Sequence, residues 1–482
     1  MSEPPSKAAP SNRKFYLLVT AIVLAAVLSG VISALRTGPT ELEQLKADLR
    51  AKGEKLTFEE LMPGVLSTNR PPSRAADLER IVKVLRAKSR QVEAFELIHH
   101  LGDGSAEPVW SRTNLLTSAG KNSPGSAVGW QELNETFAAV EGEITEAFAL
   151  VAILDTHAGL NFDIFARKYQ HLGDKGNLVR WFAAIHAAHL RVGRVTDAML
   201  AWDAAMQLAE WHQDELTVID QRARVVLALA VSSLTWSTLQ FRDLRTAQIN
   251  HMLERWLGPA TISHPLRAME VERAMGLRAF TLARERGVSA LLGGSERALD
   301  PLRKVIADGD ELFFLRQSQT WFDLARRAES SKSFSQAKVD MASFDAELET
   351  QLRSWRGIGY VVTTFSWLGT PGHERSQKIF HRGRTNREMS LAALALELHR
   401  RKHGRHPESL ARLVPEFLPA VPVDWMDGQP LRYRLESDGS YTLWSVGDNL
   451  TDDGGDASGP PVNMRRNDMW EGRDAVWPRL AP

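Results

Sequence analysis

An acidic, glycine-containing loop near the C-terminus holds the residue types best suited to chemistry. The stretch DNLTDDGGD carries oxygen-bearing side chains on Asp448, Asn449, Thr451, Asp452, Asp453 and Asp456. Ca²⁺ takes about 6–8 oxygen ligands from carboxylates, amides, hydroxyls and backbone carbonyls. Without a cation, four carboxylates in so short a loop would repel one another. The loop therefore predicts either a calcium site or a solvated acidic turn.

Two histidines form a second pattern that could bind a metal. His186 and His189 lie three residues apart in HAAHL, so a helix would place both on one face. The nearby sequence offers no acidic third ligand, and the HExxH motif is absent. Core or surface positions are therefore favoured over a metal site. For His399, His403 and His406 we expect packing and hydrogen bonding in a later helix and turn.

The sequence contains no familiar catalytic constellation. It has no GxSxG elbow, no Walker loop and no GxGxxG fingerprint. It also has no cysteine, which excludes disulfides, thiolate metal sites and a cysteine nucleophile. We therefore predict neither catalytic residues nor an organic cofactor site.

Charge balance bounds the class of partner. Lysine plus arginine total 59 and aspartate plus glutamate total 59, so the formal net charge of the 482-residue chain is zero. Proteins dedicated to nucleic acids usually carry a basic face or stripe. We therefore expect no nucleic-acid partner.

An apolar run near the N-terminus predicts a membrane anchor. Residues 1–14 are polar and read as a cytoplasmic tail, and residues 15–35 carry no charge. About 20 apolar residues suffice for a helix to cross a bilayer, and Lys7, Arg13 and Lys14 mark the preceding side as cytoplasmic. We therefore expect a single-pass protein of the bacterial inner membrane, with the rest of the chain in the periplasm. A cleaved signal peptide is the alternative, but its apolar core is usually shorter.

The region after the anchor is expected to be helical. Residues 36–74 read as a solvated stalk and linker, and residues 75–360 show apolar spacings of three and four residues. Within this body, HLRVGRVTDAMLAWDAAMQLAEWH has a glycine between two helices and small residues at packing positions, so it resembles one tetratricopeptide unit. We expect an irregular helical array, followed by a connector at residues 361–384.

The last region, residues 385–482, predicts a helix, a Gly-containing break, a short helix, a β-hairpin and the acidic loop. Its recognisable pieces, in order, are His403–Pro407, Leu413–Pro415, Val421–Asp424, Asp427–Gly428, Pro430, Tyr433, Ser445–Gly447, Asp452–Gly455, Asp474 and Trp477. This ordered set resembles the C-terminal domain of type II secretion major pseudopilins. The whole chain also resembles membrane-anchored bacterial proteins in which a segment like GEKLTFEEL follows the anchor, a resemblance that implies no activity.

The pseudopilin resemblance implies a bound calcium ion. The family's ligands are a carbonyl before a glycine, a loop aspartate and a late aspartate before the terminal tryptophan. On this chain these map to Val446, to Asn449 or its neighbour Asp448, and to Asp474, and the acidity of the loop adds Asp452 and Asp453 to the candidate set. The family's processing pattern is missing, because Lys14 precedes Phe15 and no glutamate follows at the fifth position. A filament subunit is therefore only an alternative.

These patterns together predict a mainly α protein. We expect an N-terminal transmembrane helix, an irregular tetratricopeptide-like array and a small α+β pseudopilin-like head. The expected function is a membrane-anchored periplasmic interaction or scaffold protein with a calcium-binding head, linked to secretion or envelope assembly. Its expected partners are the membrane and other envelope proteins. The alternatives are a hydrolase with its active site in the helical body, or a secretion filament subunit.

The anchor reading makes a prediction about the mature protein. Mass spectrometry of the membrane fraction should recover peptides from the intact N-terminus, because neither signal peptidase nor prepilin peptidase should cut the chain. A mature protein that begins after the apolar run would instead support a cleaved signal peptide.

Overall fold

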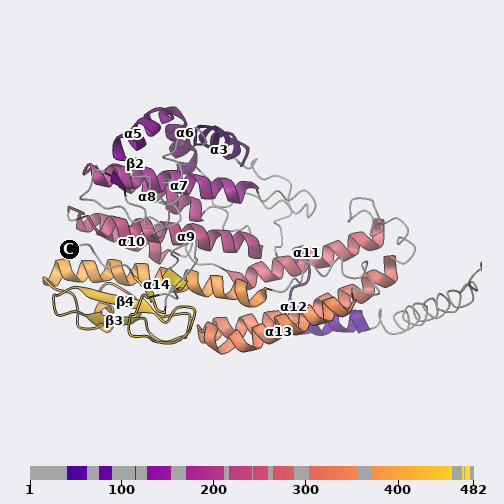
Figure 1. Ribbon diagram of the computed structural model, residues 1–482. Coiled ribbons are helices and arrows are strands. Elements are labelled where there is room, and N and C mark those ends of the chain that lie inside the picture. The colour runs from indigo at the N-terminus through magenta and orange to yellow at the C-terminus, as the bar shows by residue number, and fades with distance from the viewer. Residues whose placement is uncertain are drawn as a thin grey trace, which may run out of the picture. The chain divides into compact units, whose positions relative to one another are not determined.

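The computed structural model is mainly helical with small sheets, as the sequence predicts (Figure 1). It describes residues 41–61, 75–89, 114–115, 128–153, 170–210, 217–241, 243–258, 264–286, 303–355, 372–458, 469–471 and 473–477. The predicted anchor at residues 15–35 lies outside these ranges. None of the helices within them is long and apolar enough to cross a membrane. The chain divides into two compact units, which are treated separately below.

Unit 1 comprises Met1–Pro63, Arg273–Thr320 and Glu349–Thr370. Its described elements are a helix over residues 41–51, the short α2 (Phe58–Leu61), and parts of α11 (Pro265–Arg286), α12 (Arg303–Ser331) and α13 (Phe334–Trp355).

Residues 41–61 are packed in unit 1, which corrects the expectation of a solvated stalk. Leu42, Leu49 and Leu56 are all buried. The buried guanidinium of Arg273 on α11 donates to Glu54 Oε2 at 2.8 Å. These three leucines, spaced as an apolar stripe among charged residues, form a packing face. A stripe among many charges looks the same in sequence whether it is buried or solvated.

The helical part of unit 2 is a stack of neighbouring helices. Its elements are α3 (Ala75–Ser89), α5 (Trp130–Ala138), α6 (Glu141–Ala152), α7 (Gln170–Arg191), α8 (Val195–Glu210), α9 (Val218–Leu239), α10 (Thr246–Leu257) and α14 (His373–His403), with the unit's share of α11, α12 and α13. Contacts join α7 to α8, α8 to α9, and both α9 and α10 to α14. Figure 1 shows these helices as successive layers.

Small residues and shared hydrogen bonds hold the layers together. Helices α7 and α8 are joined through Gly193, which has φ +75° and therefore supplies the left-handed turn between them. The hydroxyl of Thr235 on α9 accepts the indole N–H of Trp202 at 3.0 Å and that of Trp256 at 3.1 Å. One buried oxygen thus satisfies two buried tryptophans from α8 and α10.

The C-terminal head of unit 2 carries a three-stranded antiparallel sheet. The strands are β3 (Arg432–Leu435), β4 (Tyr441–Ser445) and β5 (Ala475–Val476), with β4 in the middle and Tyr433 opposite Leu443. The 3₁₀ helices are η6 (Leu410–Leu413) and η7 (Met469–Glu471), and a separate pair joins β1 (Asn114–Leu115) to β2 (Val128–Gly129). Helix α14 starts at His373, inside the predicted connector, and ends at His403, with Gly404 as its C-cap.

Helices α9 and α14 cross closely at one glycine, which generates a prediction. A Cβ built on Gly383 would lie 2.7 Å from Val225 Cγ1. Gly383→Ala should therefore lower the free energy of unfolding by about 1–3 kcal/mol, because overpacking forces the helices apart. Urea denaturation of the purified chain measures this.

The matched control is Gly176→Ala on α7, where an added Cβ meets nothing within 4 Å. There, the better helix propensity of alanine should raise stability by up to about 1 kcal/mol. Adding Val225→Ala to Gly383→Ala should recover part of the loss. If both glycine variants behave alike, the close crossing is not a constraint.

Candidate functional site

The acidic loop and its surroundings in the head form the candidate site. Among the predicted ligands, Asp474 lies at the start of β5 and is fully buried. Its carboxylate accepts the backbone N–H groups of Gly455 at 2.7 Å, and of Asp453 and Asp456 at 3.2 Å each. Burial raises the pKa of Asp474, although these three hydrogen bonds oppose the shift. Asp474 therefore holds the end of the loop through the backbone.

Asp448 and Asn449, at the start of the loop, make different contacts. The Asp448 carboxylate accepts Arg382 Nε at 2.7 Å and pairs with Lys378 Nζ at 3.2 Å, both on α14. The side-chain amide of Asn449 donates to Asp453 Oδ2 at 2.7 Å. Two helical cations thus bind the first carboxylate of the loop to α14.

Asp452 faces the sheet. Its carboxylate accepts the indole N–H of Trp444 at 2.9 Å and Arg432 Nε at 3.4 Å. The Trp444 hydrogen bond is the main reason that the pKa of Asp452 lies below its usual value, with the Gly454 N–H and Arg432 adding to it. The last predicted ligand, Val446, donates its N–H to another carboxylate, that of Asp424, at 2.9 Å.

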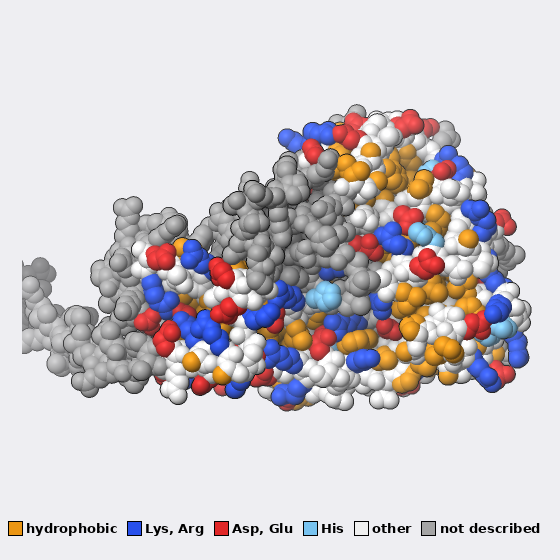
Figure 2. All heavy atoms as spheres, turned by 180° about the vertical axis from the view of Figure 1, so that it is seen from behind, with side chains coloured by type: hydrophobic (Ala, Val, Ile, Leu, Met, Phe, Trp, Pro, Cys, Tyr) orange, Lys and Arg blue, Asp and Glu red, His pale blue; other side chains and the backbone are white. Residues whose placement is uncertain are grey.

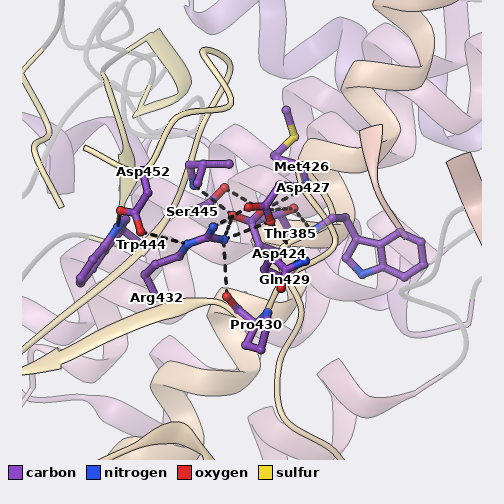
Figure 3. Close-up of polar contacts among 12 residues, drawn as sticks. Thr385, Asp424, Met426, Asp427, Gln429, Pro430, Arg432, Trp444, Ser445 and Asp452 are labelled. Carbon is purple, nitrogen blue, oxygen red and sulfur yellow. Dashed lines mark hydrogen bonds and ion pairs between the residues drawn. The ribbon is translucent and has the colours of Figure 1, made fainter. Parts of the chain in front are cut away.

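The buried carboxylate of Asp424 is the centre of this network (Figure 3). Besides the Val446 N–H, its oxygens accept the Ser445 hydroxyl at 2.8 Å, the Met426 N–H at 3.0 Å and the Thr385 hydroxyl of α14 at 3.3 Å. Arg432 Nη1 approaches within 3.2 Å. Burial raises the pKa of Asp424, while these hydrogen bonds favour the charged form.

Arg432 collects three carboxylates around one guanidinium, as Figure 3 shows. It contacts Asp424, Asp452 and, through both terminal nitrogens, Asp427. Sequence reasoning missed this role. Nothing in the sequence marks Arg432, because Asp424 and Asp427 share one turn, Asp452 lies 20 residues further along the chain, and only the fold brings all three to the same guanidinium.

The head is also joined to the turn between α12 and α13. Phe334 N–H donates to the Trp425 carbonyl at 3.0 Å, and Ser335 N–H donates to the Met426 carbonyl at 2.9 Å. A Cβ built on Gly428 (φ +80°) would meet the Ser331 carbonyl oxygen at 3.0 Å, so this position requires glycine on two counts. The Asp424 segment therefore packs directly on the helical body of unit 2.

The carboxylates of the predicted calcium site are contacted by cations and N–H groups in this structure. A calcium ion requires free oxygen ligands, whereas Asp448 is paired with cations and Asp474 with N–H donors. Within the described ranges, no three or more histidine, aspartate or glutamate side chains form a group that could hold a metal ion. As placed, the implied set does not fit a calcium ion, and calcium binding stays a prediction.

The predicted histidine pair is part of the helical core. His186 is fully buried, and its Nε2 lies 2.8 Å from the Thr238 hydroxyl of α9. Burial lowers the pKa of His186 to about 3 and also lowers that of His189. His399 contacts the Arg405 carbonyl at 3.0 Å, and the His406 ring packs against Tyr441.

A histidine–aspartate pair between α13 and α14 was not predicted from the sequence. His373 Nδ1 lies 2.5 Å from Asp345 Oδ1 of α13, and Asp345 also accepts the backbone N–H groups of His373 and Glu374. Burial alone would raise the pKa of Asp345, but these hydrogen bonds hold it below its usual value. Such pairs orient the catalytic base in some hydrolases. Here the carboxylate caps the first turn of α14, and no sequence signal links the two residues.

Buried neutral histidines make stability depend on pH. Burial lowers the pKa of His381, which packs against Trp425 and Phe334, to about 4. Because the unfolded chain binds these protons near pH 6.5, stability should fall as pH drops from about 6.5 toward 4, at most ~1.4 kcal/mol per unit of pKa shift. His381→Gln should flatten this acid limb in urea denaturation at several pH values.

The exposed His403 provides the matched control, as His403→Gln. An acid limb that is equally steep in the parent chain and in both variants would contradict the assignment to His381.

Comparisons with protein-family models, with curated proteins and with solved structures find no match for this chain. The pseudopilin resemblance of the head therefore rests on the residues quoted above.

Proposed function

We propose that this protein is a membrane-anchored interaction or scaffold protein of the bacterial envelope. In this proposal the helical array of unit 2 presents the binding surface, and the pseudopilin-like head stabilises one end of it. The observation that carries the proposal is an exposed apolar face on α9. Ile219 and Val226 are 45% and 59% exposed and lie two helical turns apart on that face.

The surroundings of this face support a protein partner. Large apolar side chains that remain exposed on one face of a helix favour contact with another protein. Leu200 on α8 and Leu257 on α10 are exposed as well. Figure 2, in which no element is labelled, shows apolar side chains that gather at several places between charged ones. Apolar contacts with a charged rim are the usual anatomy of a protein interface.

The build of the array supports the same role. The α7–α8 hairpin turns at Gly193 and packs through Ala198, Ala201 and Ala205, which are fully buried. Small residues at such positions let two helices approach closely, as in tetratricopeptide units. Stacked helical pairs of this kind mostly bind other proteins along an extended face. The proposed partner is an envelope protein that offers an apolar helix or strand.

This proposal predicts a site-specific contact in cells. A photo-crosslinking residue in place of Ile219 should give one discrete adduct, which mass spectrometry identifies as the same envelope protein in independent samples. Adding Val226→Asp should abolish the adduct, because a charge would be buried in the apolar contact.

The matched control adds Asn250→Asp, an exposed position on α10, and should leave the adduct unchanged. Circular dichroism confirms that each variant keeps its helical content. An adduct that persists with Val226→Asp, or a crosslinker at Ile219 that captures nothing, would refute a partner on this face.

A further inference from the structure

The described part of the head gathers several carboxylates around the acidic loop, and those named below have partners within the chain. Two of the acidic side chains are the buried Asp424 and Asp474. The others come from the turn after Asp424 and from the acidic loop: Asp427, Asp448, Asp452, Asp453 and Asp456. Carboxylates packed this closely destabilise a fold unless cations or N–H donors neutralise them. The question is which groups supply that neutralisation.

Arg432 supplies most of it at the buried end of the cluster. Its Nη1 lies 3.0 Å from Asp427 Oδ1 and 3.2 Å from Asp424 Oδ2, and its Nε lies 3.4 Å from Asp452 Oδ2. The Pro430 carbonyl oxygen is a further acceptor at 3.4 Å. A guanidinium has five N–H donors in a fixed plane and keeps its charge at any physiological pH. It can therefore serve several carboxylates at once, as a bound metal ion would.

Cations of α14 and of the segment before β5 pair with the carboxylates at the two ends of the loop. Asp448 is paired with Arg382 and Lys378, and Arg382 also stacks over the Trp470 ring at 5.6 Å. At the far end of the loop, Asp456 pairs with Arg473 at 3.3 Å. The loop is thus fixed to the helix at its start and to the segment before β5 at its end.

The buried late aspartate uses backbone donors instead. The three N–H groups that point at Asp474 would face a cation with their positive ends if calcium were bound to the same carboxylate oxygens. Gly447, with φ +62°, brings the backbone so close that a Cβ there would meet Ala475 N and Arg473 O at 3.2 Å. The space beside Asp474 is therefore filled by the chain.

We propose that the chain's own cations close the head: Arg432 at Asp452, and Arg382 and Lys378 at Asp448, take the neutralising role that the pseudopilin resemblance implies for calcium. The acidic loop is then held against α14 by the ion pairs of Asp448, and the head folds without a metal ion. This proposal rests on the contacts above and stands apart from the proposed interaction surface. It also gives the acidic loop a role that neither a calcium site nor a solvated turn would give it.

Thermal unfolding of the full chain in detergent, with EGTA and with millimolar calcium, tests the proposal. The parent chain should melt at the same temperature in both conditions. Arg432→Met should lower the midpoint by roughly 5–15 °C, because three carboxylates lose their shared cation. Calcium should then raise the midpoint of this variant, since a divalent ion can occupy the vacated acidic cluster.

Arg405→Met is the matched control, because Arg405 is an exposed arginine of the same head whose ion pair with Glu408 is long, at 3.7 Å. Its midpoint should stay at that of the parent chain. Asp452→Asn offers a milder perturbation if Arg432→Met does not fold. It removes one partner of Arg432 at the edge of the cluster, and should lower the midpoint less without creating a calcium response.

Two results would overturn the proposal. The first is a calcium-dependent rise in the parent chain that Asp474→Asn removes, which would establish the calcium site. The second is an Arg432→Met variant that melts together with Arg405→Met, which would leave Arg432 without a stabilising role.

Discussion

A buried carboxylate places the strongest constraint on the C-terminal half of this protein. Asp424 has no exposed surface, and a charge without partners at such a position would be very costly. Its partners come from α14, from the turn after Asp424 and from strands β3 and β4. All of these segments must be in place before the carboxylate is satisfied. The head and the helix beneath it should therefore form together as one cooperative unit.

Helix α14 is the element on which this unit is assembled. One part of it crosses α9 at Gly383, and Ser390 exchanges a hydrogen bond of 2.7 Å with Ser232 of α9. Its first turn is capped by Asp345 of α13, and Thr385 reaches the Asp424 carboxylate. The helix thus connects the helical layers to the head through polar contacts that fix its position along and around its axis. Apolar packing alone is less directional.

The acidic loop shows that the local sequence and the tertiary structure can give different answers about which group neutralises a cluster of carboxylates. Read alone, DNLTDDGGD is a cluster of like charges that calls for an external cation. In the folded chain Arg382 and Lys378 arrive from a helix about 65 residues earlier, and Arg432 arrives from a neighbouring strand. Repulsion estimated over a short window leaves out every charge that the fold brings in. The contact between Asp345 and His373 cannot be seen in a short window for the same reason, because the two residues are 28 apart in the sequence.

Periodic and turn-forming residues let the sequence determine the helical class, the glycine turn at Gly193, and the order of helix, break, short helix and hairpin at the C-terminus. These features depend on neighbours a few residues away, and that information is present in any short window. Burial of residues 41–61, the core position of His186, and the pairing of the head's carboxylates were decided only by tertiary structure. Each of them depends on partners that a short window of sequence does not identify, because burial and charge neutralisation are properties of the surroundings and not of the residue.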